Sequence, residues 1–139
     1  MTVTQILDLF FQEYLALNPL DATQLGYHKW DNRFVNIFSD KYLTDLDTLY
    51  TKYLNQLQST AVHSDKDNVN VESFKYQASY AFRQKQLPLQ KIPITPYNNV
   101  FLNLVDLIVT PGQQLLKTNC NQKKLRQRMR EFSDSIPTL

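Results

Sequence analysis

SDKYLTDLDTLYTKYLNQLQ, residues 39–58, shows the clearest periodic pattern in the chain. Its leucines and tyrosines recur at steps of three and four residues, which places them on one face of an α-helix. Ser39, followed by Asp40, is a good residue to cap the start of that helix. We therefore predict an amphipathic helix from Ser39 to about Gln58. Its apolar stripe consists of Tyr42, Leu43, Leu46, Leu49, Tyr50, Tyr53, Leu54 and Leu57.

The same spacing predicts a helix on each side of this one. The first runs from about Val3 to Leu17 and is opened by a capping box of Thr2 and Gln5. A polar break, STAVHSDKDN, follows residue 58, and a further helix is expected over about 71–86. The apolar face of that helix consists of Phe74, Ala78, Ala81 and Phe82.

The C-terminal part of the chain predicts a rigid connection and two more helices. Three prolines between Leu87 and Pro96 exclude a helix interior there. A helix is expected over about 98–109 and a last one over about 121–133. The last helix is indicated by apolar residues at steps of four, three and four, namely Leu125, Met129, Phe132 and Ile136.

Composition agrees with a folded, all-α chain. Of the 139 residues, 42% are hydrophobic and 20% are charged, which is far from the composition of a disordered protein. Only two glycines are present, too few for a glycine-rich phosphate loop or for the tight turns of an all-β fold. We predict one helical domain over residues 1–139, an irregular bundle of about five to six helices with a proline-rich connection.

The cysteine count, the N-terminal residues and the length of the apolar runs predict the cellular compartment and the membrane topology of the protein. Cys120 is the only cysteine, so an intramolecular disulfide is excluded and an oxidising compartment is not required. The N-terminus lacks the pattern of a signal peptide, and no apolar run approaches the roughly 20 residues that span a bilayer. We expect a cytoplasmic protein without a membrane span; the alternative, if a leader has been removed, is a periplasmic or secreted protein.

Catalytic motifs are missing from the sequence. His28 and His63 lie far apart and do not form a two-histidine helical metal motif, and Cys120 has no histidine near it in sequence. No Gly-x-Ser-x-Gly elbow is present. The sequence therefore predicts no catalytic, cofactor-binding or metal-binding residue in this chain.

A crowded polar stretch, NPLDATQLGYHKWDNRF (residues 18–34), is the strongest candidate site. Pro19 begins a short helix after an Asn18 cap, and Gly26 ends it by taking a left-handed backbone conformation. The residues that follow suit a structural corner, in which polar groups bond to helix ends and to each other while Tyr27, Trp30 and Phe34 fill the core. The candidate corner residues are His28, Trp30, Asp31 and Arg33.

The run KKLRQRMRE, residues 123–131, is the one strong charge cluster. We expect Leu125 and Met129 to dock on the core while the basic side chains face solvent. These side chains are Lys123, Lys124, Arg126, Arg128 and Arg130. An autonomous interaction module that binds nucleic acid or an acidic partner through this helix is the alternative function, and it predicts affinity that falls steeply with salt. Nucleic acid is the less favoured partner because neither interleaved aromatics nor a helix-turn-helix pattern is present.

Both ends of the chain resemble one known family. FFQEYLALNPLDATQLGYHKWDNRF, followed by Ser39, and KKLRQRMREFSDSIPTL are similar to the opening and to a later Arg-containing helix of the bacterial domain of unknown function 885 family. Asn32 departs mildly from the acid that is commoner there. The matching N-terminal positions are Asn18, Pro19, Ala22, Thr23, Gly26, His28, Asp31, Asn32 and Ser39.

The resemblance implies a role within a longer protein. Members of that family resemble gluzincin-type zinc metallopeptidases and carry a His-Glu-x-x-His-like motif in a later segment, which these residues lack. The chain would then be a non-catalytic N-terminal scaffold, with zinc expected only in the full-length protein and the remainder of that protein as its partner. The loop of His28, Trp30, Asp31 and Arg33 would line a substrate cleft, and uncovered helix faces would favour self-association.

Overall fold

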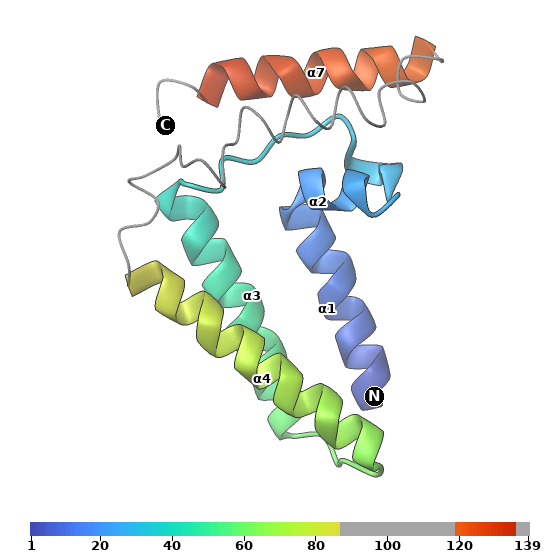
Figure 1. Ribbon diagram of the computed structural model, residues 1–139, viewed down its shortest axis with the longest axis vertical. Coiled ribbons are helices and arrows are strands. Elements are labelled where there is room, and N and C mark those ends of the chain that lie inside the picture. Colours follow the sequence, from blue (N-terminus) through green and yellow to red (C-terminus); the bar gives the residue numbers. More distant parts are fainter. Residues whose placement is uncertain (87–118, 136–139) are drawn as a thin grey trace. The chain divides into compact units, whose positions relative to one another are not determined.

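The computed structural model describes residues 1–86 and 119–135 (Figure 1). All regular secondary structure within these residues is helical. The all-α prediction is confirmed over these residues, in which no strand occurs. The predicted proline-rich connection and the predicted helix over 98–109 lie outside them. The elements are α1 (Val3–Leu17), α2 (Pro19–Gln24), the 3-10 turn η1 (His28–Trp30), α3 (Asp40–Gln58), α4 (Asp65–Gln86) and α7 (Asn119–Ser135).

Local sequence signals account for the ends of α1 and α4. The predicted capping box opens α1, since the Thr2 backbone N–H donates to Gln5 Oε1 at 2.9 Å and the Gln5 N–H donates to Thr2 Oγ1 at 3.3 Å. The predicted start of α4 near residue 71 is wrong, because α4 begins at Asp65. Ser64 caps it by accepting the Asp67 N–H on its Oγ at 3.1 Å, and Asp65 and Asp67 lie in the first turn, where acids are favourable.

The chain divides into two compact units that are not continuous in sequence. Over the described residues, the first unit contains 1–14 and 40–86, and the second contains 15–39 and 119–135. The expectation of a single domain over residues 1–139 stays a prediction. Each unit is described separately below.

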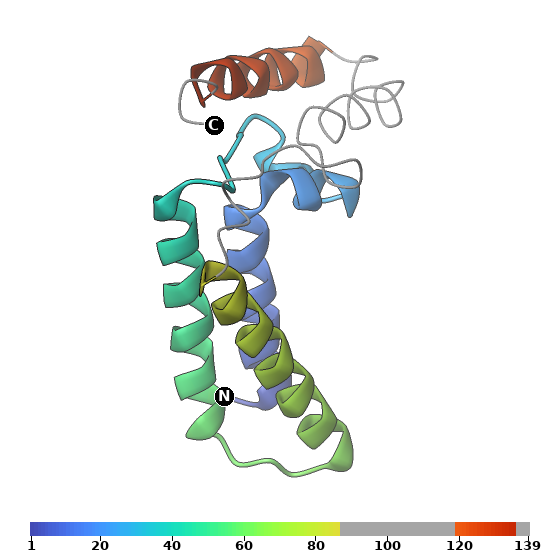
Figure 2. The same cartoon turned by 60° about the vertical axis from the view of Figure 1, so that its left-hand side comes forward.

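The first unit packs α1, α3 and α4 around a cluster of aromatic rings. In Figures 1 and 2, α3 and α4 form an antiparallel pair joined by the short segment 59–64. Phe10 is the centre of the cluster, with its ring centroid 5.1 Å from that of Tyr50, 5.5 Å from Tyr53 and 4.7 Å from Phe74. These rings come from all three helices, so their packing is what holds the first unit together.

An ion pair joins α1 to α3 at the edge of this cluster. Lys52 Nζ donates to both carboxylate oxygens of Glu13, at 2.7 and 2.8 Å. The hydrogen bond from Lys52 lowers the pKa of Glu13, and the same bond raises the pKa of Lys52. Both side chains are nearly half exposed, so water and salt screen the pair and its contribution to stability is small.

Candidate functional site

A tight helix ending shapes the start of the candidate corner. The Gly26 N–H donates to the Thr23 carbonyl at 3.0 Å, and the Tyr27 N–H donates to the Ala22 carbonyl at 2.8 Å. These two bonds form a Schellman motif, and Gly26 has the positive φ of 84° that such a motif requires. Asn18 precedes α2 as expected, but its side chain makes no capping hydrogen bond to that helix. Asn18 is nevertheless the N-cap residue of α2 as predicted, with its backbone carbonyl accepting the Ala22 N–H at 3.0 Å.

The turn η1 delivers Asp31 into the interior of the second unit. Asp31 is buried, and its Oδ1 accepts a hydrogen bond of 2.7 Å from the Thr23 hydroxyl of α2. Its Oδ2 lies 3.0 Å from Nδ1 of His28, whose side chain is 55% exposed. A buried carboxylate requires such partners, because an unpaired charge in the interior is strongly unfavourable.

The cation that faces this carboxylate is Arg128 of α7, 97 residues further along the chain. Arg128 is only 1% exposed, and its Nη2 donates to the Thr23 hydroxyl oxygen at an N···O distance of 2.8 Å. Nη2 lies 3.8 Å from Asp31 Oδ1. The Thr23 hydroxyl therefore accepts from the guanidinium and donates to the carboxylate, so it bridges the two charges.

Backbone carbonyls complete the surroundings of the guanidinium. Arg128 Nε donates to the Arg33 carbonyl at 2.9 Å, and Nη2 also lies 3.0 Å from the Trp30 carbonyl and 3.3 Å from the Pro19 carbonyl. The planar guanidinium has five N–H groups, which suits this divergent set of acceptors. Arg128 thus contacts the start of α2, the end of η1 and the loop beyond. We call Thr23, His28, Asp31 and Arg128 the buried-arginine network.

The electrostatics of this network reflect its burial. Desolvation lowers the pKa of Arg128, while the negative charges of Asp31 and Glu131 act in the opposite direction. The guanidinium nevertheless stays cationic, because arginine is not deprotonated in proteins. One buried positive charge therefore stands beside one buried carboxylate.

Two further contacts hold α7 over the loop of the second unit. Glu131 Oε2 accepts the Phe34 backbone N–H at 2.7 Å, and the Phe34 ring packs edge-on against Phe132 at a centroid distance of 5.0 Å. Partly buried apolar side chains surround Phe132, namely Leu20, Phe34, Ile37 and Phe38. Figure 1 shows α7 lying across this loop.

The four predicted corner residues contribute in different ways. Asp31 and His28 enter the network through their side chains, whereas Trp30 and Arg33 enter it through their backbone carbonyls. The Arg33 side chain is exposed and that of Trp30 is partly buried. Tyr27 is exposed, so the expectation that it fills the core is wrong.

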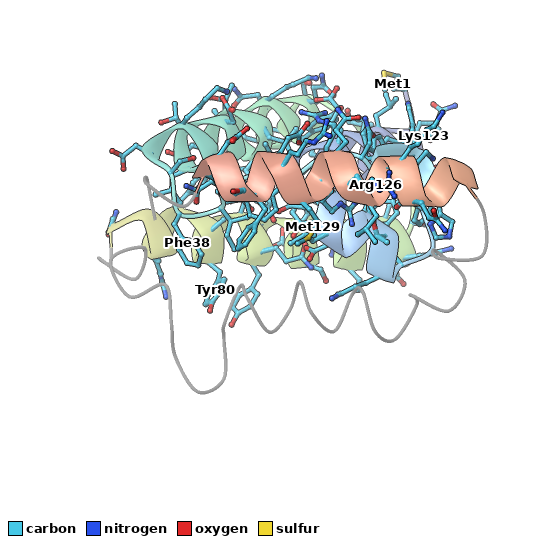
Figure 3. All side chains as sticks on the ribbon, turned by 90° about the horizontal axis from the view of Figure 1, so that it is seen from above. Met1, Phe38, Tyr80, Lys123, Arg126 and Met129 are labelled. Carbon is cyan, nitrogen blue, oxygen red and sulfur yellow. The ribbon has the colours of Figure 1, made fainter. Side chains whose placement is uncertain are left out.

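The predicted basic surface of the last helix needs a correction at Arg128. Arg128 is buried and Met129 is 40% exposed, which reverses the expected positions of these two neighbours. The residues of α7 that face inward are Leu125, Arg128 and Phe132. Arg128 is among them because buried acceptors of the second unit accept hydrogen bonds from its guanidinium. Figure 3 labels Lys123, Arg126 and Met129 on this helix.

The other basic residues of α7 are distributed between two environments. Lys124 is partly buried and donates from Nζ to the His28 carbonyl at 3.1 Å. Lys123, Arg126 and Arg130 are exposed. The surface that remains is thus smaller than the five residues expected.

Sequence reasoning missed the pairing that organises this site. Thr23 appeared only as one position of the resemblance, and Arg128 only as part of a charged surface. A signal was nevertheless present, since Arg128 is three residues after Leu125 and four before Phe132, as an inward-facing residue of α7 would be.

Comparison with known proteins identifies no relative: no family model, no curated protein and no solved structure matches this chain. Within residues 1–86 and 119–135, no group of three or more His, Cys, Asp or Glu side chains could hold a metal ion. In the same part of the chain, none of the helices has the length and apolar character to cross a membrane.

Proposed function

We propose that this chain is a non-catalytic helical scaffold within a longer, metallopeptidase-like protein of the domain of unknown function 885 type. The observation that carries the proposal is the buried-arginine network. Thr23, His28 and Asp31 belong to the first block of the resemblance, and Arg128 belongs to the second. The residues that make both blocks distinctive are therefore bonded to one another in the second unit.

The chemistry of the network supports a structural role. Both oxygens of the Asp31 carboxylate have a partner within hydrogen-bonding distance, and Arg128 donates to backbone and side-chain oxygens. A nucleophile or general base must instead reach a substrate. The network is thus suited to holding α2, η1 and α7 together.

We further propose that this loop forms part of the wall of a substrate cleft, through the side chains that point away from the buried-arginine network. The His28 side chain is half exposed, and the Arg33 side chain is exposed next to the carbonyl that holds Arg128. In a longer protein, these side chains would face a substrate while the buried groups behind them keep the loop in place. Any zinc would be held by residues beyond this chain.

Thr23→Val in the 139-residue chain tests the scaffold role. The substitution keeps the shape and removes the hydroxyl that bridges Asp31 and Arg128, so we expect the free energy of unfolding to fall by about 1–3 kcal/mol. The matched control is Thr44→Val, an exposed threonine whose hydroxyl donates to the Asp40 carbonyl within α3, and we expect a change within about 0.5 kcal/mol. Urea denaturation measures both.

The proposal that this chain is part of a longer, metallopeptidase-like protein is tested by the gene sequence and by the activity of the complete protein. We expect the reading frame to continue beyond the codon for Leu139 into a His-Glu-x-x-His helix. A stop codon at that point would contradict the proposal. In the complete protein, Thr23→Val should leave turnover per folded molecule unchanged, and a drop in turnover at unchanged stability would assign the network to the chemistry instead.

The alternative, an autonomous module that binds nucleic acid or an acidic partner through α7, stays a second proposal. It is favoured by Lys123, Arg126 and Arg130, which are exposed at steps of three and four along that helix. Binding of duplex or single-stranded nucleic acid should then weaken steeply with added salt, as counterions are released. A titration at low salt without measurable binding would remove the nucleic-acid form of this proposal.

A further inference from the structure

His28 combines a buried hydrogen-bond partner with an exposed side chain. It begins the 3-10 turn η1, and Asp31 follows directly after the end of that turn, three residues later. Side chains three residues apart lie over one another in a 3-10 turn, which brings Nδ1 of His28 to 3.0 Å from Oδ2 of Asp31. The His28 side chain is 55% exposed, whereas that of Asp31 is 2% exposed.

The Asp31 carboxylate determines which ring nitrogen of His28 carries the proton. Asp31 faces the permanently charged guanidinium of Arg128 at 3.8 Å, and an ionised carboxylate can only accept hydrogen bonds. The contact with His28 is therefore a hydrogen bond from Nδ1–H to Oδ2. Only one nitrogen of a neutral imidazole is protonated, so Nε2 keeps its lone pair.

The second ring nitrogen, Nε2, is the group of His28 that remains available. Among residues 1–86 and 119–135, the ring has no hydrogen-bond partner besides Asp31. The two ring nitrogens point in different directions, so the lone pair of Nε2 is directed away from the buried carboxylate. The backbone is held as well, since the His28 carbonyl accepts a hydrogen bond of 3.1 Å from Lys124 Nζ. His28 thus presents an oriented acceptor on a half-exposed side chain.

We propose that His28 is the residue through which this loop contacts a peptide, with Nε2 accepting a hydrogen bond from an uncharged backbone N–H group. An ammonium group is disfavoured because two lysines adjoin this residue. Lys124 Nζ contacts the His28 carbonyl, and Lys29 is exposed, with its Nζ 5.0 Å from the centre of the Trp30 ring. The charge of the carboxylate behind the ring is offset by Arg128. A cationic ligand would therefore meet like charge.

The inference deepens the proposed cleft wall and rests on it for the class of ligand. The exposed acceptor at Nε2 follows from the geometry of His28 and Asp31, whereas the peptide follows from the proposed metallopeptidase-like protein. The role of His28 is binding, as expected of a scaffold that performs no chemistry. A ring that is already oriented also favours binding, because little side-chain freedom is lost when the ligand arrives.

NMR of the 139-residue chain tests the tautomer without any ligand. In long-range proton–nitrogen spectra at about pH 9, where an ordinary histidine is neutral, we expect His28 to carry its proton on Nδ1. His63, an exposed histidine in the segment before α4, is the control in the same spectrum and should show both tautomers. Asp31→Asn offers a donor where the carboxylate accepts, so it should move the proton of His28 to Nε2. A natural chain in which His28 is protonated at Nε2 would overturn the inference.

Diethyl pyrocarbonate tests whether the lone pair of Nε2 is accessible, because this reagent acylates an imidazole nitrogen only where a lone pair is free. We expect His28 to be acylated at Nε2, at a rate comparable to that of the exposed His63. A His28 that stays unmodified while His63 reacts would show that Nε2 is covered, and it would overturn the inference.

His28→Asn in the complete protein tests the contact with a peptide. Asparagine keeps an N–H donor near the position of Nδ1 and has no atom at that of Nε2, so the bond to Asp31 persists while the acceptor is lost. With fluorogenic peptides as substrates, KM should rise about fivefold at unchanged kcat, the effect of one hydrogen bond used in binding. The matched control is His63→Asn, which should change neither constant.

Two outcomes of this last experiment contradict different statements. An unchanged KM for His28→Asn would overturn the peptide contact and leave the proposed scaffold intact. A complete protein that turns over no peptide would contradict the proposed function and the peptide contact with it. The acceptor at Nε2 then stands or falls with the NMR and acylation results, which are measured on the 139-residue chain.

Discussion

Arg128→Met should lower the free energy of unfolding by about 3 to 5 kcal/mol, the largest single effect expected in the second unit. Methionine fills a similar volume but leaves Asp31 as an uncompensated buried charge. It also removes the Arg128 donor from the Arg33 carbonyl and one donor from the Trp30 carbonyl, which keeps the Arg33 N–H. Urea denaturation followed by circular dichroism measures the change.

Arg126→Met is the matched control for this prediction. Arg126 is exposed and lies two residues away on the same helix, so its substitution should change stability by about 0.5 kcal/mol or less. Equal effects of the two substitutions would contradict the structural role of Arg128. Arg128→Lys keeps the charge and loses the planar donor geometry, so its stability should fall between those of Arg128→Met and the natural chain. It also gives a measurable intermediate if Arg128→Met does not fold.

The double variant Asp31→Leu with Arg128→Met separates charge from packing. It removes both buried charges together, so it should be more stable than Arg128→Met alone. The recovery should be partial, because the Arg33 carbonyl still lacks the Arg128 Nε donor and the Pro19 and Trp30 carbonyls have each lost one of their donors. A double variant less stable than either single variant would show that the carboxylate does not depend on the guanidinium.

Phe10→Ala should have the second large effect, a loss of about 3 to 5 kcal/mol in the first unit. The Phe10 ring contacts aromatic rings from α3 and α4, so truncation opens a cavity where the three helices meet. It also removes edge-on ring pairs with Tyr53 and Phe74. Thermal and urea unfolding measure the loss.

Leu9→Ala serves as the neighbouring control in α1. Leu9 is exposed, so its truncation should cost less than about 1 kcal/mol. Phe10→Leu, which keeps an apolar group of smaller volume, should lie between the control and Phe10→Ala. A Phe10→Ala variant as stable as Leu9→Ala would contradict a core built around Phe10.

The elements of the fold were predictable wherever their signals are local. The bounds of α1 follow from its periodic apolar residues and from the Thr2 and Gln5 capping box, all within a few residues of one another. The glycine ending of α2 is local in the same way. The start of α4 was misplaced because the prediction followed its apolar residues, which become regular only near Val71, instead of the Ser64 cap.

The buried face of α7 could not be predicted from the residues of that helix alone. Hydrophobicity alone assigns Met129 to the interior and Arg128 to solvent, and the structure has the reverse. A buried guanidinium is favourable only when acceptors surround it, and here these acceptors come from Thr23, Asp31 and three carbonyls about 100 residues earlier. Helix formation depends on neighbours in sequence, whereas burial of a charge depends on which distant groups the fold brings to it.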